Sequence, residues 1–257
     1  GGWAVKVAGD DDEEAPYVTM TERLVEVFPW NGGKFQIEPD ASSGSYFLAA
    51  REMVSPSKGM DRSEEYGVEV PTERLSAVSV VNWPQSGWQA DQHFSEFLSA
   101  GVLFHATREL ENRGKAVTEA SLDVSLIDTR ASEVSRKTDL ADSIMTAVVM
   151  IAGMDLRFSR YGEQVAFTDL GRLRVQECER VVALRTELTK CGARVVEEGD
   201  TLTVYPAKPG ELHGAEIETY NDHRMAMCFA ILGLKVPGIR LKNPSCVKKT
   251  FPNFFQK

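Results

Sequence analysis

The eight residues from Tyr220 to Met227 place unlike demands on one short segment. An apolar helix is predicted from Met225 to Leu234, and Asp222 before it is a residue type that commonly caps a helix. Arg224 falls in the first turn, where a cation opposes the helix dipole. An arginine there is tolerable when it faces an anion, because free backbone N–H groups also point out of a helix N-terminus. The alternative is a capped core helix with one solvated arginine.

A second pair of charged residues lies earlier in the sequence. Glu177 precedes Arg180 by three residues, so a helix over this segment would present both side chains on one face. A planar guanidinium can hold a carboxylate through two hydrogen bonds. The alternative is a surface ion pair that contributes only about 0.2–0.5 kcal/mol.

Composition and charge are those of an ordinary globular chain. Of 257 residues, 42% are apolar and 26% are charged, and the net charge of −9 argues against nucleic acid as a partner. Any anion site must therefore gather its basic residues locally. No stretch approaches the apolar length that crosses a bilayer, and residues 1–3 show no signal-peptide pattern, so we expect a cytoplasmic protein without a membrane partner. The first residue is not methionine, which indicates a partial chain.

The cysteines and histidines show no metal-ligand spacing, and we expect neither a metal nor a cofactor. The cysteines lie in helix or strand patterns without CxxC pairs, which favours reduced thiols in the core or lining a site. They are Cys178, Cys191, Cys228 and Cys246. His223 lies between Asp222 and Arg224 and could serve as a general base, although a structural role is the favoured interpretation.

The hydrophobic pattern predicts alternating strands and helices, and therefore an α/β fold. Residues near 54–76 are polar, contain proline and glycine, and have no clean periodicity, which indicates an irregular insertion. Helices are predicted at residues 17–28, 41–53, 89–100, 140–151, 174–190 and 222–234. Strands are predicted at residues 77–81, 102–107, 122–127, 156–159, 165–168, 215–219 and 238–242, with a hairpin over 193–205 that turns at 198–200.

Four blocks resemble 5-enolpyruvylshikimate-3-phosphate (EPSP) synthase, and they occur in the order of that family. The blocks are Asp40–Phe47, Leu173–Arg180, Tyr220–Met227 and Asn243–Pro252. The resemblance implies an enolpyruvyl-transferase-type α/β domain of three similar sheet-and-helix units around a buried helix core. Residues 37–257 would form the C-terminal domain of such an enzyme, and residues 1–36 a remnant of its N-terminal domain.

The resemblance implies transfer of the enolpyruvyl group of phosphoenolpyruvate to the 5-hydroxyl of shikimate 3-phosphate, in the pathway to aromatic amino acids. This reaction needs a proton for the methylene carbon, a base for the hydroxyl, and cations for a carboxylate and a phosphate. Arg180 and Arg224 match the pair that binds the carboxylate of phosphoenolpyruvate. Lys249 matches the lysine on the departing phosphate. Glu177 matches the acid that protonates the methylene carbon.

The remaining matches concern shikimate 3-phosphate. Asp142 matches the aspartate that orders the ring hydroxyls, although Asp139 competes for this position and either could merely cap the helix 140–151. Tyr17 matches a tyrosine near the shikimate phosphate. Gln176 replaces a lysine of the family, and Arg172 replaces an asparagine. If this segment is helical, Arg172 and Gln176 share a face, and Arg172 could return the lost charge.

The blocks that form the rest of the family's N-terminal domain are absent from this sequence. We therefore expect low turnover from the chain alone. The expected partners are phosphoenolpyruvate, shikimate 3-phosphate and a separate N-terminal half. The alternative is a non-catalytic domain that binds small anions. The apolar face of the helix 17–28, carrying Met20, Leu24 and Val27, is expected to dock on the main domain or to cause self-association.

Overall fold

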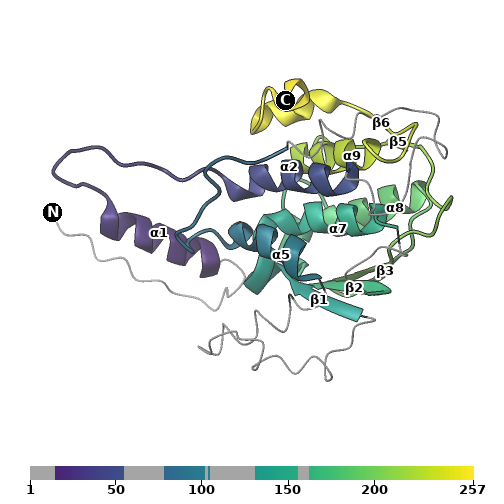
Figure 1. The fold of residues 1–257 in the computed structure, drawn as a ribbon, viewed down its shortest axis with the longest axis horizontal. Coiled ribbons are helices and arrows are strands. Elements are labelled where there is room, and N and C mark those ends of the chain that lie inside the picture. Colours follow the sequence, from purple (N-terminus) through teal and green to yellow (C-terminus); the bar gives the residue numbers. More distant parts are fainter. Residues whose placement is uncertain (1–14, 55–77, 102–103, 105–130, 156–161) are drawn as a thin grey trace.

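The computed structural model describes residues 15–54, 78–101, 104, 131–155 and 162–257. Within these ranges, a group of helices packs on a four-stranded sheet, so the predicted mixture of helix and sheet is confirmed (Figure 1). The arrangement of three similar units stays a prediction. Among the described residues, no helix has the length and apolar character needed to cross a membrane.

The main sheet contains a parallel pair and an antiparallel hairpin. Its strands, in order across the sheet, are β1 (Ala131–Ser135), β2 (Gln164–Thr168), β4 (Thr201–Val204) and β3 (Val195–Glu198). The strand β2 runs parallel to β1 and antiparallel to β4. Alternate residues such as Val165 and Phe167 are buried, because one face of the sheet lies against the helices. The predicted hairpin is confirmed, with Gly199 in the left-handed region at φ 57°.

Three helices form the centre of the domain. They are α2 (Ala41–Val54), α7 (Ile144–Gly153) and α9 (His223–Gly233), and each packs on the other two. Every residue of α7 is buried, so this helix is apolar all round. The start of α2 uses small residues because a side chain at Gly44 would meet the ring of Trp83 at 2.7 Å. The predicted buried helices at 41–53 and 140–151 are confirmed, with α7 starting later than expected.

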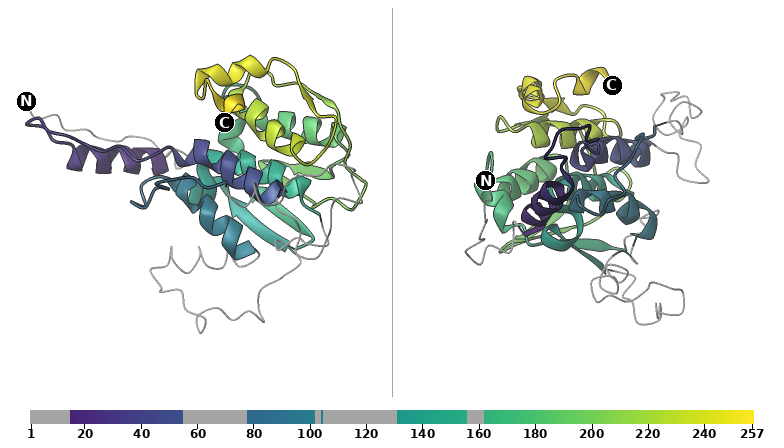
Figure 2. Two further views of the ribbon diagram at one scale, coloured as in Figure 1. Left: turned by 45° about the horizontal axis from the view of Figure 1, so that its top comes forward. Right: turned by 90° about the vertical axis from the view of Figure 1, so that its left-hand side faces the viewer.

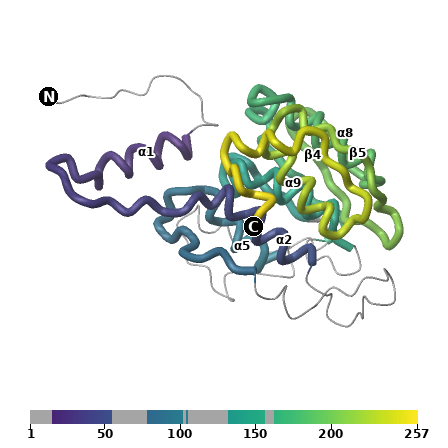
Figure 3. The backbone as a smooth tube through the Cα atoms, turned by 90° about the horizontal axis from the view of Figure 1, so that it is seen from above, coloured from purple at the N-terminus to yellow at the C-terminus, as the bar shows by residue number. Residues whose placement is uncertain are grey.

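The helix α1 (Ala15–Val27) begins beside the main body and runs away from it (Figures 1 and 2). Residues 28–40 then return to the body to begin α2 (Figure 3). No residue of α1 is buried, and Val27, Phe28 and Trp30 are exposed. The apolar face of this helix is therefore largely uncovered in the described part of the chain. Its role in docking or self-association stays a prediction.

The junction before α2 is fixed by polar contacts with the loop 85–89. Glu38 accepts hydrogen bonds from the backbone N–H groups of Gln85 and Ser86, at 3.2 and 3.0 Å. Gln89 donates to the Pro39 carbonyl and accepts from the Ala41 backbone N–H. Asp40 caps α2 by accepting from the Ser42 backbone N–H at 3.0 Å. These contacts place the first turn of α2 beside the centre of the molecule.

The helix predicted over 174–190 begins later than expected. Residues Gly171–Val175 form a short 3₁₀ helix, η8, and α8 (Arg180–Lys190) starts only at Arg180. The side chain of Glu179 caps α8 by accepting from the Val182 backbone N–H at 2.5 Å. Arg174 pairs with Glu179, Glu197 and Asp200, which ties the segment before α8 to the β3–β4 hairpin. The segment 176–179 is therefore a fixed bend rather than helix.

The last part of the chain lies over α2 and α9. The strands β5 (Glu216–Ile217) and β6 (Arg240–Leu241) form a parallel pair, which confirms the two predicted strands in shortened form. The 3₁₀ helices η9 (Pro244–Lys249) and η10 (Phe254–Gln256) follow. The rings of Phe251 and Phe254 pack on Phe47 and Tyr46 of α2, with ring centres 5.7 and 5.8 Å apart. This packing anchors Lys249 near the end of η9.

Other predictions fall partly or wholly outside the described residues. The strand predicted at 77–81 is wrong over residues 78–81, which lead instead into a turn with Asn82 at φ 54°. The insertion near 54–76 and the strands at 122–127 and 156–159 lie outside the described residues, apart from residue 54 at the end of α2. Of residues 102–107 only Phe104 is described. The helix predicted at 89–100 is confirmed as the 3₁₀ turn η2 (Ala90–His93) followed by α5 (Phe94–Ala100).

Candidate active site

The N-terminus of α9 is organised by one fully buried carboxylate. Asp222 has no exposed surface and caps α9 by accepting from the Arg224 backbone N–H at 2.8 Å. Its other oxygen accepts from Nε of Arg180 at 2.7 Å. The capping role predicted from sequence is confirmed. One carboxylate thus fixes both the backbone of Arg224 and the side chain of Arg180.

Arg180 reaches from the start of α8 into a row of acceptors. It is 1% exposed, and its guanidinium contacts Glu177 at 2.6 Å and the side-chain oxygen of Gln176. Glu177 in turn accepts from Nζ of Lys249 at 2.5 Å. The structure therefore brings Gln176, Glu177, Arg180 and Lys249 together. The spacing of Glu177 and Arg180 in the sequence suggested a shared helical face, but Glu177 lies in the bend before α8.

Two cations hold Glu177 as a carboxylate. Burial alone would raise its pKa, but the hydrogen bond from Lys249 and the charge of Arg180 outweigh burial and lower the pKa to about 2. Glu177 is therefore ionised at neutral pH in this arrangement. Its carboxylate pairs with both Arg180 and Lys249, so an anion that binds these two cations would have to compete with Glu177.

Asp142 lies between two arginines. Its Oδ1 accepts from Nη2 of Arg136 at 3.1 Å, and its Oδ2 lies 3.1 Å from Nη2 of Arg224. Burial works to raise the pKa of Asp142, but the charges of Arg224 and Arg136 outweigh it and the pKa is lowered. Arg224 also donates to the hydroxyl groups of Ser42 and Tyr46 on α2. The alternative that Asp142 merely caps α7 is wrong, because its side chain is held by these arginines.

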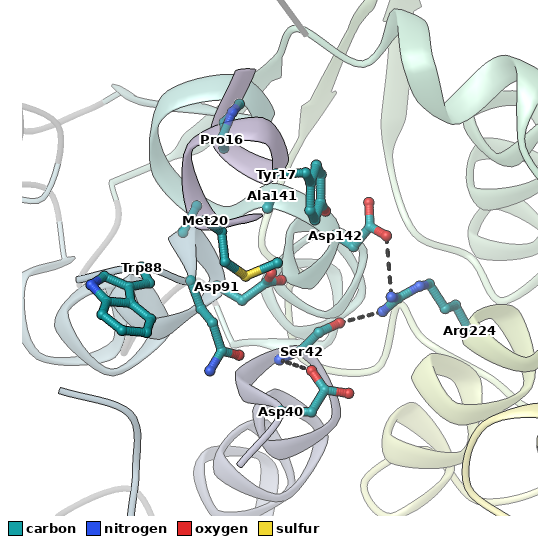
Figure 4. Close-up of a pocket in the computed structure, with 12 residues that line it drawn as sticks. Pro16, Tyr17, Met20, Asp40, Ser42, Trp88, Asp91, Ala141, Asp142 and Arg224 are labelled. Carbon is teal, nitrogen blue, oxygen red and sulfur yellow. Dashed lines mark hydrogen bonds and ion pairs between the residues drawn. The ribbon is translucent and has the colours of Figure 1, made fainter. Parts of the chain in front are cut away.

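A pocket of about 140 Å³ lies beside this group (Figure 4). Arg224, Asp142 and Tyr17 all line it, so the structure brings the start of α1 to the same pocket as α9. The other lining residues are Pro16, Met20, Asp40, Ser42, Trp88, Gln89, Ala90, Asp91 and Ala141. Burial and the charge of Asp142 raise the pKa of Tyr17, which keeps its hydroxyl protonated.

The backbone before Asp142 is strained. Ala141 has φ 44°, in the left-handed region that non-glycine residues rarely adopt. The turn is held by Asp91, whose carboxylate accepts from the Ser143 backbone N–H at 2.7 Å. Sequence reasoning missed Asp91 and Arg136. Asp91 lies 52 residues before Ser143, so no local pattern reports the contact.

The predicted role of Arg172 depended on a helix that the structure does not contain. Arg172 lies in η8, and Gln176 ends that helix at φ −88° and ψ −140°. The two residues therefore do not share a helical face, and the physical reason is the cap at Glu179, which starts α8 late. The involvement of Arg172 in ligand binding stays a prediction.

Two thiols and an imidazole also lie beside Asp222. Cys178 and Cys246 donate to Asp222 from 3.5 Å, in line with thiols that line a site. Burial and Asp222 raise the pKa of Cys178 to about 12, so it is a protonated thiol. His223 is 4% exposed, and burial together with Arg224 lowers its pKa. In the described ranges no group of three or more His, Cys, Asp or Glu residues is placed to hold a metal ion.

Replacing Asp91 with asparagine is expected to change how stability depends on pH. Burial and the charge of Asp142 raise the pKa of Asp91 from 3.8 to about 7. Between these values the folded protein keeps a proton that the unfolded chain has lost, so stability falls as pH rises from about 4 to about 7. Asparagine can still accept from the Ser143 N–H but cannot ionise. We expect Asp91→Asn to be more stable above pH 7, by at most about 4 kcal/mol.

Urea unfolding at several pH values measures this effect. The advantage of Asp91→Asn should shrink as pH falls and vanish below about pH 4, where both side chains are neutral. The control Asp91→Ala removes the acceptor for the Ser143 N–H and should be less stable than wild type below about pH 4, where the native side chain is neutral. A benefit of the asparagine that does not vary with pH would contradict the account.

A helix N-terminus with buried arginines and a pocket beside it is typical of proteins that bind small anions. Residues 76–257 match the family model of EPSP synthase (3-phosphoshikimate 1-carboxyvinyltransferase). This chain belongs to the EPSP synthase family.

Its relatives agree with this assignment. The chain is 33% identical over 226 residues to the 3-phosphoshikimate 1-carboxyvinyltransferase of Colwellia psychrerythraea (strain 34H), a match that covers 87% of this chain and 43% of the relative. The enzyme of the same name from Actinobacillus succinogenes is 30% identical over 253 residues, covering 98% of this chain and 49% of the relative. The chain thus spans less than half the length of these relatives. A solved EPSP synthase from Acinetobacter baumannii is 26% identical, with a TM-score of 0.39 over 45% of this chain and 26% of that one.

Proposed function

We propose that this chain carries part of an EPSP synthase active site, which transfers the enolpyruvyl group of phosphoenolpyruvate to the 5-hydroxyl of shikimate 3-phosphate. The observation that carries the proposal is the gathering of Arg180, Arg224 and Lys249 around α9, in direct contact with Glu177 and Asp142. A chain of net charge −9 has no general attraction for anions, so this local concentration of cations favours a specific anion site.

The three cations suit the two charged ends of phosphoenolpyruvate. Arg180 and Arg224 would hold its carboxylate, because a planar guanidinium can donate two parallel hydrogen bonds. Lys249 would hold the departing phosphate as a compact point charge. Each cation is paired with a protein carboxylate: Arg180 with Asp222 and Glu177, Arg224 with Asp142, and Lys249 with Glu177. An incoming anion must therefore compete with these pairs.

This competition would convert Glu177 into a general acid. Glu177 owes its low pKa to Lys249 and Arg180, as described above. When phosphoenolpyruvate draws these cations away, the carboxyl group of Glu177 loses the hydrogen bond and the charges that lower its pKa, so its pKa rises. It can then bind a proton and deliver it to the methylene carbon. Loss of phosphate would restore the double bond and return that proton to Glu177.

Asp142 would act on the second substrate. Held as a carboxylate, it can accept the proton of the 5-hydroxyl as that oxygen attacks phosphoenolpyruvate. Gln176 and Arg172 would contact the same substrate, with Gln176 giving a hydrogen bond in place of a lysine charge. Tyr17, which lines the same pocket, would lie near the shikimate phosphate.

The site would form one wall of a cleft. We assign residues 37–257 to the C-terminal domain and residues 1–36 to a remnant of the N-terminal domain, and expect the protein in the cytoplasm. The other wall would come from an N-terminal half, through which the shikimate phosphate is anchored. Holding two anions in reacting contact lowers a barrier by about 7–11 kcal/mol in well-oriented systems. One wall of the cleft alone supplies little of this barrier lowering, so the isolated chain should turn over slowly or not at all.

Phosphate release from shikimate 3-phosphate plus phosphoenolpyruvate tests the proposal. The 257-residue chain is assayed alone and with the N-terminal half of a relative added in trans. We expect activity only from the mixture. The matched variant Glu177→Gln keeps the size of the side chain but removes its proton, and should reduce the turnover of the mixture by about 10²–10⁴-fold.

Each outcome separates the alternatives. A folded chain that binds inorganic phosphate but gives no turnover with any N-terminal half would favour the non-catalytic anion-binding domain. Family membership favours the transferase, because the relatives carry the name of that activity. Robust turnover by the 257-residue chain alone would show that catalysis does not need a second wall.

A further inference from the structure

We propose that Arg136 is a positioning residue of this site, which holds the Asp142 carboxylate from the oxygen that Arg224 does not contact. The family resemblance assigns no role to Arg136. The catalytic meaning of this inference rests on the proposed function, but the geometry and its test do not.

Arg136 directly follows Ser135, the last residue of β1. Residues Arg136–Leu140 form a single wide helical turn, capped by Ser135, whose hydroxyl accepts from the Thr138 backbone N–H at 3.1 Å. Ser135 is itself fixed, because its backbone N–H donates to Asp139 at 2.8 Å and its hydroxyl donates to Asp169. A side chain that leaves such a turn has little freedom, which suits a residue that must hold another in place.

The side chain of Arg136 is deeply buried for a cation. It is 1% exposed, and it gives one hydrogen bond to Asp142 at 3.1 Å. Its Nε has no hydrogen-bond partner among the described residues. A buried unsatisfied donor costs about 1–3 kcal/mol, so the arrangement is a poor one for stability alone. Proteins leave a buried donor unpaired mostly at functional sites, where the residue has a role beyond stability.

Asp142 is surrounded by charged and titratable groups from five elements. Arg224 on α9, Arg136 after β1 and Arg180 on α8 favour its ionised form, against the effect of burial. Asp91 in η2 and Tyr17 on α1 also face it. Asp91, whose pKa lies at about 7, is largely neutral below that pH. Arg136 is one of only two arginines among these groups that touch the carboxylate in the described structure.

Arg136 also offers an explanation for the neutral residue at position 176, where the family has a lysine. The sequence suggested that Arg172 restores the lost charge, from a helical face that the structure does not contain. Among the groups that lower the pKa of Asp142, the residue outside the family's matched set is Arg136. A fixed cation on Asp142 keeps this carboxylate ionised and oriented without any charge at position 176.

The titration of Asp142 in the full chain, without substrate, tests the inference. Its carboxyl carbon is followed by ¹³C NMR as a function of pH and assigned by comparison with Asp142→Asn. Arg136→Gln should raise the pKa of Asp142 by about one unit or more. Arg136→Lys, which keeps the charge, should preserve the low pKa. Lys137→Gln removes the same charge one residue further along and should leave the titration unchanged.

The outcomes are decisive for Arg136 itself. An unchanged Asp142 titration in Arg136→Gln overturns the inference, and so does an equal shift in Lys137→Gln. Arg136→Met fills the same space without a polar group and replaces the glutamine variant if that variant does not fold. In the activity mixture, Arg136→Gln should move the acid limb of the kcat profile upward by the same shift and leave the KM for phosphoenolpyruvate unchanged. Absence of wild-type turnover would count against the proposed function only, because the NMR titration needs none.

Discussion

Replacing Arg180 with methionine is expected to destabilise the fold by about 3–5 kcal/mol. Arg180 is 1% exposed and Asp222 is fully buried, with 2.7 Å between Nε and Oδ2. Methionine fills the space of the aliphatic part but leaves Asp222 as a buried charge without its cation. The same carboxylate caps α9, so the loss reaches the core helix as well as the site. Urea unfolding at pH 7 measures the change.

Two controls separate the buried charge from the loss of an arginine. The double variant Arg180→Met with Asp222→Asn should recover most of the stability, because asparagine can still cap α9 and carries no charge. Arg185→Met removes another arginine of α8, whose partner Glu197 lies at 2.7 Å but whose side chain is 42% exposed. That change should cost less than about 1 kcal/mol. Equal costs for the variants at positions 180 and 185 would contradict the account.

Local sequence rules predicted the parts of the site that depend on neighbouring residues. Asp222 before an apolar run predicted the cap and the place of Arg224, and both are confirmed. The helix predicted from residue 41 begins there as α2, and Asp40 caps it. These succeed because a cap and its helix lie within a few residues, where the hydrogen-bond geometry is set by the backbone.

The errors arose where distant residues decide the structure. Glu177 and Arg180 have helical spacing, yet Arg174 binds Glu197 and Asp200 of the hairpin and holds the segment in a bend. No periodicity reports that interaction, because its partners lie more than 20 residues away. The pairing of Arg136 with Asp142 depends on a wide turn that sequence patterns do not signal. The strand β1 was missed because it is short and serine-rich.

These distant contacts, and not the motif alone, determine how the charges of the site are paired. The charges of Arg224 and Lys249 are paired with the carboxylates of Asp142 and Glu177. Under the proposed function, the affinity for an anion would depend on these two carboxylates as well as on the cations. A change in either carboxylate should alter the charge available to an anion.

Replacing Arg224 with alanine is expected to abolish most binding of inorganic phosphate and phosphoenolpyruvate. Hydrogen bonds to a charged group contribute about 1.5–3 kcal/mol, which corresponds to roughly 10–100-fold in affinity. The loss should be larger than one contact suggests, because Asp142 is left in the pocket with one arginine fewer and repels an incoming anion. Isothermal titration of the full chain at pH 7 measures both affinities.

The controls are the loss of an arginine elsewhere in the chain and a charge-preserving change at position 224. Arg194 lies with its guanidinium 3.8 Å from the ring centre of Tyr205 and lines no part of the described pocket around Arg224, so Arg194→Ala should leave phosphate binding unchanged. Arg224→Lys keeps the charge but not the paired donors, and should retain part of the affinity for phosphate and less of that for a carboxylate. Thermal unfolding of each variant establishes that it is folded at the titration temperature. Full phosphate affinity in a folded Arg224→Ala variant would show that this arginine serves only Asp142, Ser42 and Tyr46, and the anion site would then have to lie at Arg180 and Lys249 alone.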